Sequence, residues 1–401
     1  MKEIMKIPEE LLRGSPGQRV VLCPGAEDAV AALAGRLSGA GSAVLFTGRN
    51  SADRCRAAAA VERAAKLSEC RIERFGDIEP EPCMATVEKM RTFLSAHPVD
   101  AVVAAGGGSV LDAAKAAYLS YQTGLPLAEH FGVDKYSSRH PDIDLKRIIA
   151  IPTTSGTGSE CTAYSNIVDR DLAVKKLIAE RLIVPDTAII NPQFTTSMPR
   201  SVSLATGCDA LAHLVEGLLN VRADGNHPRA NEWALTGIRL VRDYLPQVLE
   251  HPDDAEARRG MAVAAALGGM VIRFKSTGLP HLCSFSWFGR IEHGIAAALL
   301  LPASWRYYLA ESSVAERTMM LKDIFGGTDA VSVVSNFRAF LSSLGVPHSL
   351  AAYPEITPEL LRRTASSGRE NPMKLELAPR RVPLEDSVEI LSAILEAAYR
   401  G

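Results

Sequence analysis

The segment VDAVVAAGGGSVLDAAKAAYLSYQT, residues 99–123, decides the fold prediction. A short apolar run leads into three glycines, and apolar residues then recur at helical spacing. This order predicts a buried strand, a tight turn and a helix. Glycines let the backbone approach a phosphate, and the start of the helix offers free N–H groups. The turn predicts a phosphate-binding loop, with a turn without a ligand as the alternative; its residues are Gly106, Gly107, Gly108 and Ser109.

The neighbouring segments repeat this alternation. Short apolar runs begin at residues 18, 42 and 146, and helical patterns cover 27–41 and 52–68. Strands separated by helices predict a parallel sheet. The run from residue 146 ends in IPTTSGTGSE, 151–160, a second polar loop with hydroxyls and glycines. A solvated loop is the alternative, but ligands of parallel sheets bind where strands end, so two adjacent loops favour a nucleotide site.

The second half of the sequence changes to helical patterns. The predicted helices cover 200–220, 230–250, 255–272, 330–345 and 385–401. We therefore predict an α/β domain with a nucleotide-binding parallel sheet at 1–193, followed by an all-α metal-binding domain at 194–401. The cofactor and substrate are expected in a cleft between them.

Composition limits the classes of partner. The formal net charge is −2, so no basic surface for nucleic acid or an anionic membrane is expected. The seven cysteines are scattered and odd in number, which favours free thiols in a reducing compartment. The start of the sequence lacks the pattern of a signal peptide. We therefore expect a cytoplasmic protein.

Four residues form a candidate metal site. Asp209 and His213 are spaced to share one helical face, about 5–6 Å apart at Cβ, among apolar neighbours. A buried carboxylate requires a compensating partner, and a plain Asp–His hydrogen bond is one alternative. His281 and His293 also stand in apolar surroundings. One carboxylate and three imidazoles suit Fe²⁺ or Zn²⁺ with one position left open.

Together these motifs resemble the iron-containing (group III) alcohol dehydrogenase family. The matching stretches are GGGSVLDAAK (106–115), IPTTSGTGSE (151–160), PDTAIINPQFTTSMP (185–199), TGCDALAHLVEG (206–217) and EHGIAAALLLP (292–302). The resemblance implies a dehydroquinate synthase-like fold and NAD(P)-linked oxidation of small alcohols, or reduction of aldehydes, at a divalent metal. Fe²⁺ is favoured and Zn²⁺ is the alternative. A homodimer or higher homo-oligomer is also expected.

The resemblance assigns roles to individual residues. Asp209, His213, His281 and His293 fall on the catalytic metal ligands, and the glycine loop with Ser109 falls on the pyrophosphate-binding loop, with Asp112 just beyond it. Thr153, Thr154 and Ser159 fall on the nicotinamide-side loop. Lys176, or Lys175 in the other register, falls on a lysine that touches the cofactor.

The sequence departs from the family pattern around the last two ligands. His281 and His293 are twelve positions apart, where relatives usually have fourteen, so two residues are missing between Phe285 and His293 relative to the family pattern. Phe285 stands where many relatives carry a further histidine, and Glu292 replaces a proline before the last ligand. A proton-relay role of that histidine does not transfer, and an atypical substrate pocket is expected.

The coenzyme prediction depends on the loop after the second strand. Gly48, Arg49, Asn50 and Ser51 follow the strand, and no acid appears before Asp53. An acid at this place would bind the ribose 2′-hydroxyl and repel a 2′-phosphate. Its absence favours NADP(H) over NAD(H), with Gly48, Asn50 and Ser51 as cofactor-binding residues; an ordinary surface turn is the alternative.

Cations near the ligand pair suggest the substrate. Arg273, Lys275 and Arg290 could hold an anionic group on a short aldehyde, such as phosphonoacetaldehyde, although solvated cations are the alternative. HLCSFSW, 281–287, also resembles the phosphonoacetaldehyde-reducing branch of the family. The rival functions are a polyol-phosphate dehydrogenase or cyclase on the same fold, and a non-catalytic nucleotide-binding protein whose metal site has decayed.

Overall fold

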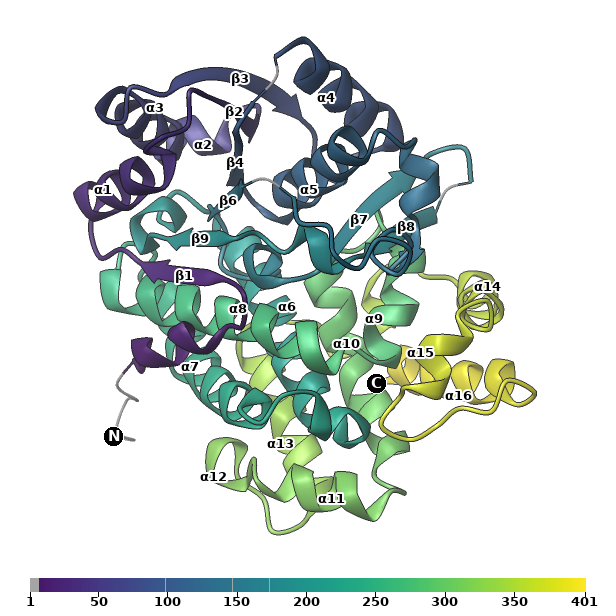
Figure 1. Ribbon diagram of the computed structural model, residues 1–401. Helices are drawn as coiled ribbons and strands as arrows, with labels where there is room; N and C mark the ends of the chain where they lie inside the picture. Colours follow the sequence, from purple (N-terminus) through teal and green to yellow (C-terminus); the bar gives the residue numbers. More distant parts are fainter. Residues whose placement is uncertain (1–6, 98, 146, 173) are drawn as a thin grey trace.

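A parallel sheet forms the N-terminal half of the protein. The computed structural model describes residues 7–401 apart from 98, 146 and 173 (Figure 1). Six strands pair in the order β1-β9-β6-β4-β2-β3, all parallel. The strands are β1 (Arg19–Leu22), β2 (Ser42–Gly48), β3 (Arg71–Ile78), β4 (Ala101–Gly106), β6 (Arg147–Pro152) and β9 (Thr187–Ile190). The predicted parallel sheet is confirmed.

Helices cover both faces of this sheet. Val102 and Ala104 of β4 face one layer, and Val103 and Ala105 face the other. The helices of the first layer are α4 (Met84–Ala96) and α5 (Gly108–Thr123), and those of the second are α1 (Ala26–Leu37) and α3 (Ala57–Leu67). All residues of β4 are buried, as expected of a central parallel strand. The glycine turn after β4 is therefore held by the most buried part of the sheet.

Three strands form a second, smaller sheet that the sequence analysis did not predict. They are β5 (Gly132–Val133), β7 (Tyr164–Asp169) and β8 (Val174–Ala179), in the order β5-β8-β7. β7 and β8 pair antiparallel, and β8 carries both Lys175 and Lys176. Their side chains point to opposite faces of the strand.

The C-terminal half is helical. The helices are α6 (Arg200–Leu219), α7 (Ala230–Glu250), α8 (Ala255–Lys275), α9 (Leu279–Ser284), α10 (His293–Tyr308), α11 (Ser312–Met319), α12 (Lys322–Phe325), α13 (Ala330–Ser343), α14 (Pro358–Gly368), α15 (Pro372–Glu376) and α16 (Ser387–Arg400). Figure 1 shows them below the sheet, with α14, α15 and α16 at one side. The predicted fold class, a parallel α/β part followed by an all-α part, is confirmed.

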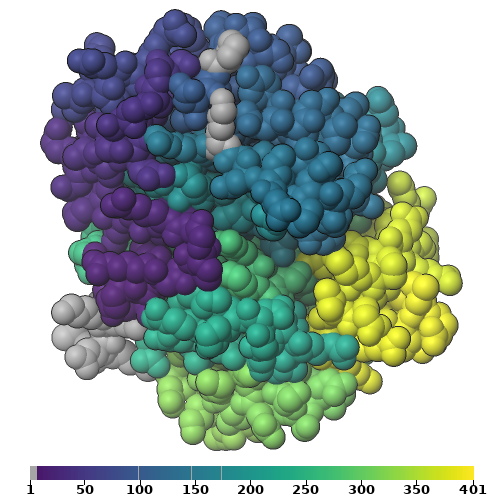
Figure 2. Space-filling view, viewed as in Figure 1, coloured from purple at the N-terminus to yellow at the C-terminus, as the bar shows by residue number. Residues whose placement is uncertain are grey.

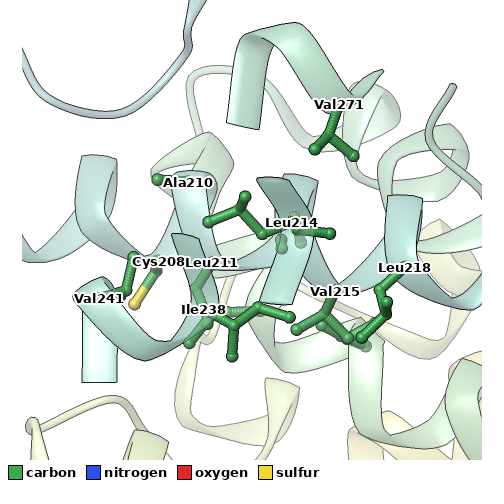
Figure 3. Close-up of a cluster of buried hydrophobic side chains, with 14 of the residues drawn as sticks. Cys208, Ala210, Leu211, Leu214, Val215, Leu218, Ile238, Val241 and Val271 are labelled. Atoms are coloured by element: carbon green, nitrogen blue, oxygen red, sulfur yellow. The ribbon is translucent and has the colours of Figure 1, made fainter. Parts of the chain in front are cut away.

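Helix α6 lies at the centre of this helical part. Its apolar side chains, Leu211 and Leu214 among them, pack against Ile238 and Val241 of α7 and Val271 of α8 (Figure 3). Among the described residues, α6 is the one helix long and apolar enough to cross a membrane, and 83% of its most apolar window is buried inside the protein. Burial by neighbouring helices accounts for its apolar composition.

Two details differ from the sequence expectations. The helix expected at 52–68 is two helices, α2 (Ser51–Arg54) and α3, separated by Arg56 in the left-handed conformation with φ 66°. The alanines on both sides of the break are helical, and the break itself falls at Cys55 and Arg56. At the chain start, Leu11 and Leu12 pack into the core of the helical part. Figure 2 shows this purple N-terminal segment resting on the green helices. The division at 193/194 stays a prediction.

Candidate functional site

A cavity of ≈ 650 Å³ lies between the sheet and the helices. The sheet side contributes the ends of β2, β4 and β6, and the helical side contributes α6, α9 and α10. Strand ends of this kind are where ligands of parallel sheets bind. The cavity is large enough for a small-molecule ligand.

Most of the predicted cofactor residues line this cavity. They are Gly48, Asn50, Ser51, Gly107, Gly108, Ser109, Asp112, Thr153, Thr154 and Ser159. Helix α5 begins directly after Gly107, so its N-terminal turn faces the cavity with a partial positive charge suited to a phosphate. Gly106 does not line the cavity: it ends β4, and a Cβ there would lie 2.5 Å from Cβ of Val110.

Two neighbouring lysines of β8 point in different directions, and Lys175, not Lys176, reaches the cavity. Lys175 lines it, and its Nζ lies 2.9 Å from Oε1 of Glu81. Lys176 lies on the opposite face of β8, with its Nζ 2.7 Å from Oδ2 of Asp169. The geometry favours Lys175, the other register of the prediction, because neighbouring side chains of a strand point to opposite faces. Its contact with the cofactor stays a prediction.

A buried lysine ties the second polar loop to helix α5. Lys115 Nζ donates to Oγ of Ser159 at 2.9 Å and to Oγ1 of Thr162 at 3.1 Å. Ser159 Oγ donates to Oδ1 of Asp112 at 2.6 Å. Gly158 has φ 61°, and a Cβ there would lie 2.5 Å from Cα of Gly269. The second loop is therefore fixed both to α5 and to α8.

Basic residues surround the cavity end at β2. Arg49 and Arg54 line it, and Arg49 Nε lies 2.6 Å from Oδ1 of the exposed Asp77. Asp53 does not line the cavity, because both its oxygens accept hydrogen bonds from Arg74, at 2.7 and 2.6 Å.

Two acids line the cavity near the same end, and both have partners. Glu81 pairs with Lys175, and Glu79 accepts from the Thr86 hydroxyl at 2.8 Å. Neither acid belongs to the 48–53 loop, and among the described residues no acid of that loop lines the cavity.

The four predicted metal ligands meet at the opposite end. Asp209 and His213 come from one face of α6, and His281 comes from the short helix α9. One potential ligand atom of each lies within 4.8 Å of those of the other two, and all three residues are buried. His281 Nε2 is 3.4 Å from Oδ1 of Asp209, so the shortened spacing still brings His281 to the cluster.

His293 lies on the cavity side of the cluster. It begins α10, and its Nε2 is 3.8 Å from Oδ1 of Asp209. Its side chain is 27% exposed, compared with 3% for His281, so the cluster opens toward the cavity at this residue. Gly294 permits the approach, because a Cβ there would lie 2.0 Å from the carbonyl oxygen of Ala205.

Glu216 is a residue of the site that the sequence analysis missed. Its Oε1 hydrogen-bonds to Nδ1 of His281, and its Oε2 accepts from the Gly278 N–H at 2.7 Å. Glu216 follows Asp209 by seven residues, which places it on the same face of α6 and could have revealed it. A proton on Nδ1 leaves Nε2 of His281 free to face Asp209 and bind a metal.

The pKa values of the cluster reflect burial and mutual charge. Burial lowers the pKa of His213 to about 4 and that of His293 to about 3. Burial alone would raise the pKa of Asp209, but His213 and the other two imidazoles hold it well below its usual range. Burial opposes the charged form of His281, but Glu216 and Asp209 raise its pKa to about 9, so this imidazole is cationic at neutral pH until a metal displaces the proton. Asp209 is ionised and His213 and His293 are neutral, which are the forms that coordinate a metal.

These groups fit a divalent cation. Asp209 Oδ1 and His281 Nε2 are buried without a hydrogen-bond partner. Unpaired polar atoms at this depth are costly, and a cation would satisfy both together. The donor set of one carboxylate and three imidazoles suits Fe²⁺ or Zn²⁺.

The cations behind the anionic-substrate prediction do not line the cavity. Lys275 Nζ pairs with Asp224 and donates to Oδ1 of Asn231 at 2.9 Å. Arg273 reaches Oγ of Ser15 at 3.5 Å, and Arg290 is exposed. These three residues therefore do not support the anionic-substrate prediction, which stays a prediction; helical patterns do not reveal which face of a helix meets the cavity.

Two other side chains line the metal end of the cavity. Phe285 stacks on His293 with ring centroids 5.4 Å apart. Lys374 reaches the cavity from helix α15, far from Phe285 in the sequence. No local sequence signal marked this lysine as part of a site.

Comparisons with known proteins agree with this arrangement. Residues 17–192 match the family described as iron-containing alcohol dehydrogenase. Residues 203–395 match the family described as Fe-containing alcohol dehydrogenase, C-terminal. The two matches together cover both the sheet and the helical part.

Individual relatives show the same similarity. Long-chain-alcohol dehydrogenase 1 of Geobacillus thermodenitrificans is 32% identical over 340 residues, 82% of each chain. Aldehyde-alcohol dehydrogenase 2 of Entamoeba histolytica is 33% identical over 257 residues, 60% of this chain but only 28% of the relative's length.

The structure is also similar to a solved one. The iron-containing alcohol dehydrogenase of Thermococcus thioreducens superposes with a TM-score of 0.84 at 25% identity, covering 96% of this chain and 99% of that chain. On these matches, the chain belongs to the iron-containing alcohol dehydrogenase family.

Proposed function

We propose that this protein is a metal-dependent, NAD(P)-linked alcohol dehydrogenase or aldehyde reductase acting on a small substrate. The observation that carries the proposal is the shared cavity: residues of the glycine loop and Asp209, His213, His281 and His293 line the same space. These four residues would hold the divalent metal, Fe²⁺ or Zn²⁺. The cavity would hold the coenzyme between the metal and the loop.

When bound, the metal supplies Lewis-acid polarisation of the substrate oxygen and the nicotinamide supplies or accepts hydride. The chain positions these groups. Glu216 fixes the ring orientation of His281. Phe285 covers His293 with an apolar ring and limits the access of water to that side.

The test is metal content together with turnover. His213→Ala should remove a ligand from the buried cluster and thereby lower bound metal and abolish coenzyme-dependent turnover. Elemental analysis and NAD(P)H absorbance with a panel of short aldehydes measure both. His227→Asn is the matched control, because His227 lies outside the cavity lining and stacks on Trp233.

Full turnover by a verified metal-free protein would contradict the proposal. Coenzyme oxidation with a polyol phosphate but with no simple aldehyde would favour the first rival function. Coenzyme binding with no turnover on any substrate would favour a non-catalytic protein. Zinc should bind at least as tightly as iron by the usual affinity order, so iron in the cell would reflect supply.

For the coenzyme we propose a preference for NADP(H). Gly48, Arg49, Asn50, Ser51 and Arg54 line the cavity end at β2. Asp53, the first acid of the loop, is engaged by Arg74. A small residue, two cations and two hydrogen-bonding side chains suit a 2′-phosphate.

A further inference from the structure

Lys374 is a buried cation at the metal end of the cavity, and its ammonium has no acidic partner. It is 7% exposed, and Nζ donates to Oγ of Ser276 at 2.8 Å, to the Thr277 carbonyl at 2.8 Å and to Oγ1 of Thr277 at 2.9 Å. All three acceptors are neutral. Within the described part of the chain, no carboxylate forms an ion pair with Lys374.

The ammonium is firmly positioned. Lys374 lies on α15, whose N-cap Asn371 accepts from the Lys374 N–H at 3.2 Å, with Pro372 at the first helical position. The next residue, Leu375, is 1% exposed. A cap, a proline and a buried neighbour fix the backbone from which the lysine extends.

The segment that Lys374 contacts also carries a metal-ligand candidate. Thr277, His281 and Phe285 are four residues apart and all line the cavity. The ammonium is held at Thr277, which lies just before α9, the helix that carries His281. A group bound to Lys374 would therefore share one cavity with a substrate oxygen at the metal cluster.

The nearest acids do not neutralise Lys374. Both Glu216 oxygens are already engaged, by His281 and by the Gly278 N–H. Burial lowers the pKa of Lys374 to about 8, although Glu216 favours its charged form, so the side chain is mainly cationic at neutral pH. Glu292 also lines the cavity, but it is exposed and its charge is screened by solvent.

We propose that Lys374 is a specificity-determining residue that binds an anionic group of the substrate. The substrate class is a short aldehyde or alcohol carrying a carboxylate, sulfonate or phosphonate. This inference rests on the proposed dehydrogenase function and names its substrate class. An anionic group entering the cavity would replace one of the neutral acceptors of the Lys374 ammonium. The new hydrogen bond would be stronger because its acceptor is charged.

The test compares substrates of equal shape and different charge. Succinic semialdehyde is paired with 4-methylpentanal, and phosphonoacetaldehyde with 3,3-dimethylbutanal, so that methyl groups replace the acidic oxygens. In the wild type, kcat/KM should favour the charged member of at least one pair. In Lys374→Met the charged-to-neutral ratio should fall about 10- to 100-fold, as expected on losing a charge-assisted hydrogen bond.

Two further variants separate charge from structure. Lys374→Arg keeps the charge and should retain much of the ratio. Loss of a merely structural lysine would slow the charged and the neutral substrate alike and leave their ratio unchanged. Arg290→Met removes an exposed cation between the two histidines and should leave the ratio unchanged. Succinate should also compete with 4-methylpentanal in the wild type, and at least tenfold more weakly in Lys374→Met.

Each outcome decides between the two proposals. An unchanged ratio in Lys374→Met overturns the role of Lys374 and leaves the dehydrogenase function standing. Should Lys374→Met fail to fold, a wild-type preference of tenfold or more for both neutral aldehydes also overturns it. If metal-loaded wild type reduces neither member of either pair nor any other short aldehyde, the dehydrogenase function fails, and this inference fails with it.

Discussion

Glu160 illustrates a residue whose charge opposes folding. It is 2% exposed, and burial raises the pKa of its carboxyl to about 7, against the attraction of Lys115. The folded state therefore holds a proton more tightly than the unfolded chain, whose pKa is near 4.5. Stability from this group is present below the unfolded pKa and is lost as pH rises to about 7.

Glu160→Gln should remove this pH dependence. The unfolding free energy of the variant, relative to that of the wild type, should increase by roughly 3 kcal/mol between pH 4.5 and pH 7. Urea unfolding at a series of pH values measures it. The exposed Glu62→Gln is the control. A difference that does not change with pH would show that Glu160 is ionised in the folded protein.

Gly48 provides the residue-level test of coenzyme choice. Gly48→Asp places a carboxylate beside the cavity, where it would repel a 2′-phosphate and accept from a ribose hydroxyl. We expect kcat/KM for NADPH to fall about 10- to 100-fold relative to NADH. Gly48→Ala controls for volume, since a Cβ there lies 3.3 Å from the nearest atom. A wild type that strongly prefers NADH would refute the NADP(H) proposal.

Single site residues were predictable from the sequence where their spacing places them on one face of a helix. Asp209 and His213 stand four apart on a helix, and the structure places them together. Glu216 follows the same spacing and was missed because no partner in the sequence pointed to it. Lys374 was not predictable at all, because only tertiary packing brings α15 to the cavity.

At the scale of elements, the site depends on the contact between α6 and α10. The first turn of α10 meets α6 at Asp209, and this contact requires a residue without a side chain at Gly294. A methyl group there would force the helices apart and move His293 away from Asp209. Helix packing and ligand geometry are therefore linked at this point.

Gly294→Ala should lower both stability and metal affinity. Overpacking of this kind costs about 1–3 kcal/mol. Gly35→Ala is the matched control: it lies in α1 with no atom within 4 Å of the added Cβ, and should be stabilising by about 0.5–1 kcal/mol. Thermal unfolding and metal titration compare the two variants. Equal metal affinity in both would show that α10 adapts without moving its histidine.

Helices with a clear helical period of apolar residues were predictable from the sequence, and elements without such a period were not. The expected helices at 200–220, 230–250 and 330–345 are α6, α7 and α13. Helix α10 was missed because it is apolar on nearly all sides and contains Pro302, so it shows no amphipathic face. The β7–β8 hairpin was missed because its strands have many polar residues and lie beside the main sheet.

For the whole molecule, the cluster joins segments that are distant in sequence. Its ligand candidates come from α6, α9 and α10, which share one hydrophobic core. A cation bound to them stabilises only the folded state. The expected homodimer or higher homo-oligomer stays a prediction. Analytical ultracentrifugation measures the oligomeric state directly.

Removal of the metal should therefore lower the melting temperature. We expect a fall of several degrees after chelation, with recovery on adding Zn²⁺ or Fe²⁺, because binding at 1,000 times Kd contributes about 4 kcal/mol. Differential scanning calorimetry measures the shift. The His213→Ala variant should show no metal-dependent shift; a shift equal to that of the wild type would place the metal elsewhere.

The position of Lys374 has a consequence for how selectivity evolves in this chain. Among the described residues after Gly294, Lys374 alone lines the cavity, while the coenzyme loops and the ligand cluster lie earlier in the sequence. On the proposed role of Lys374, one determinant of substrate preference lies apart in the sequence from the residues that carry the chemistry. A chimera that exchanges only the last thirty or so residues could acquire a new substrate, and drift in this tail could diversify paralogues whose reaction stays the same.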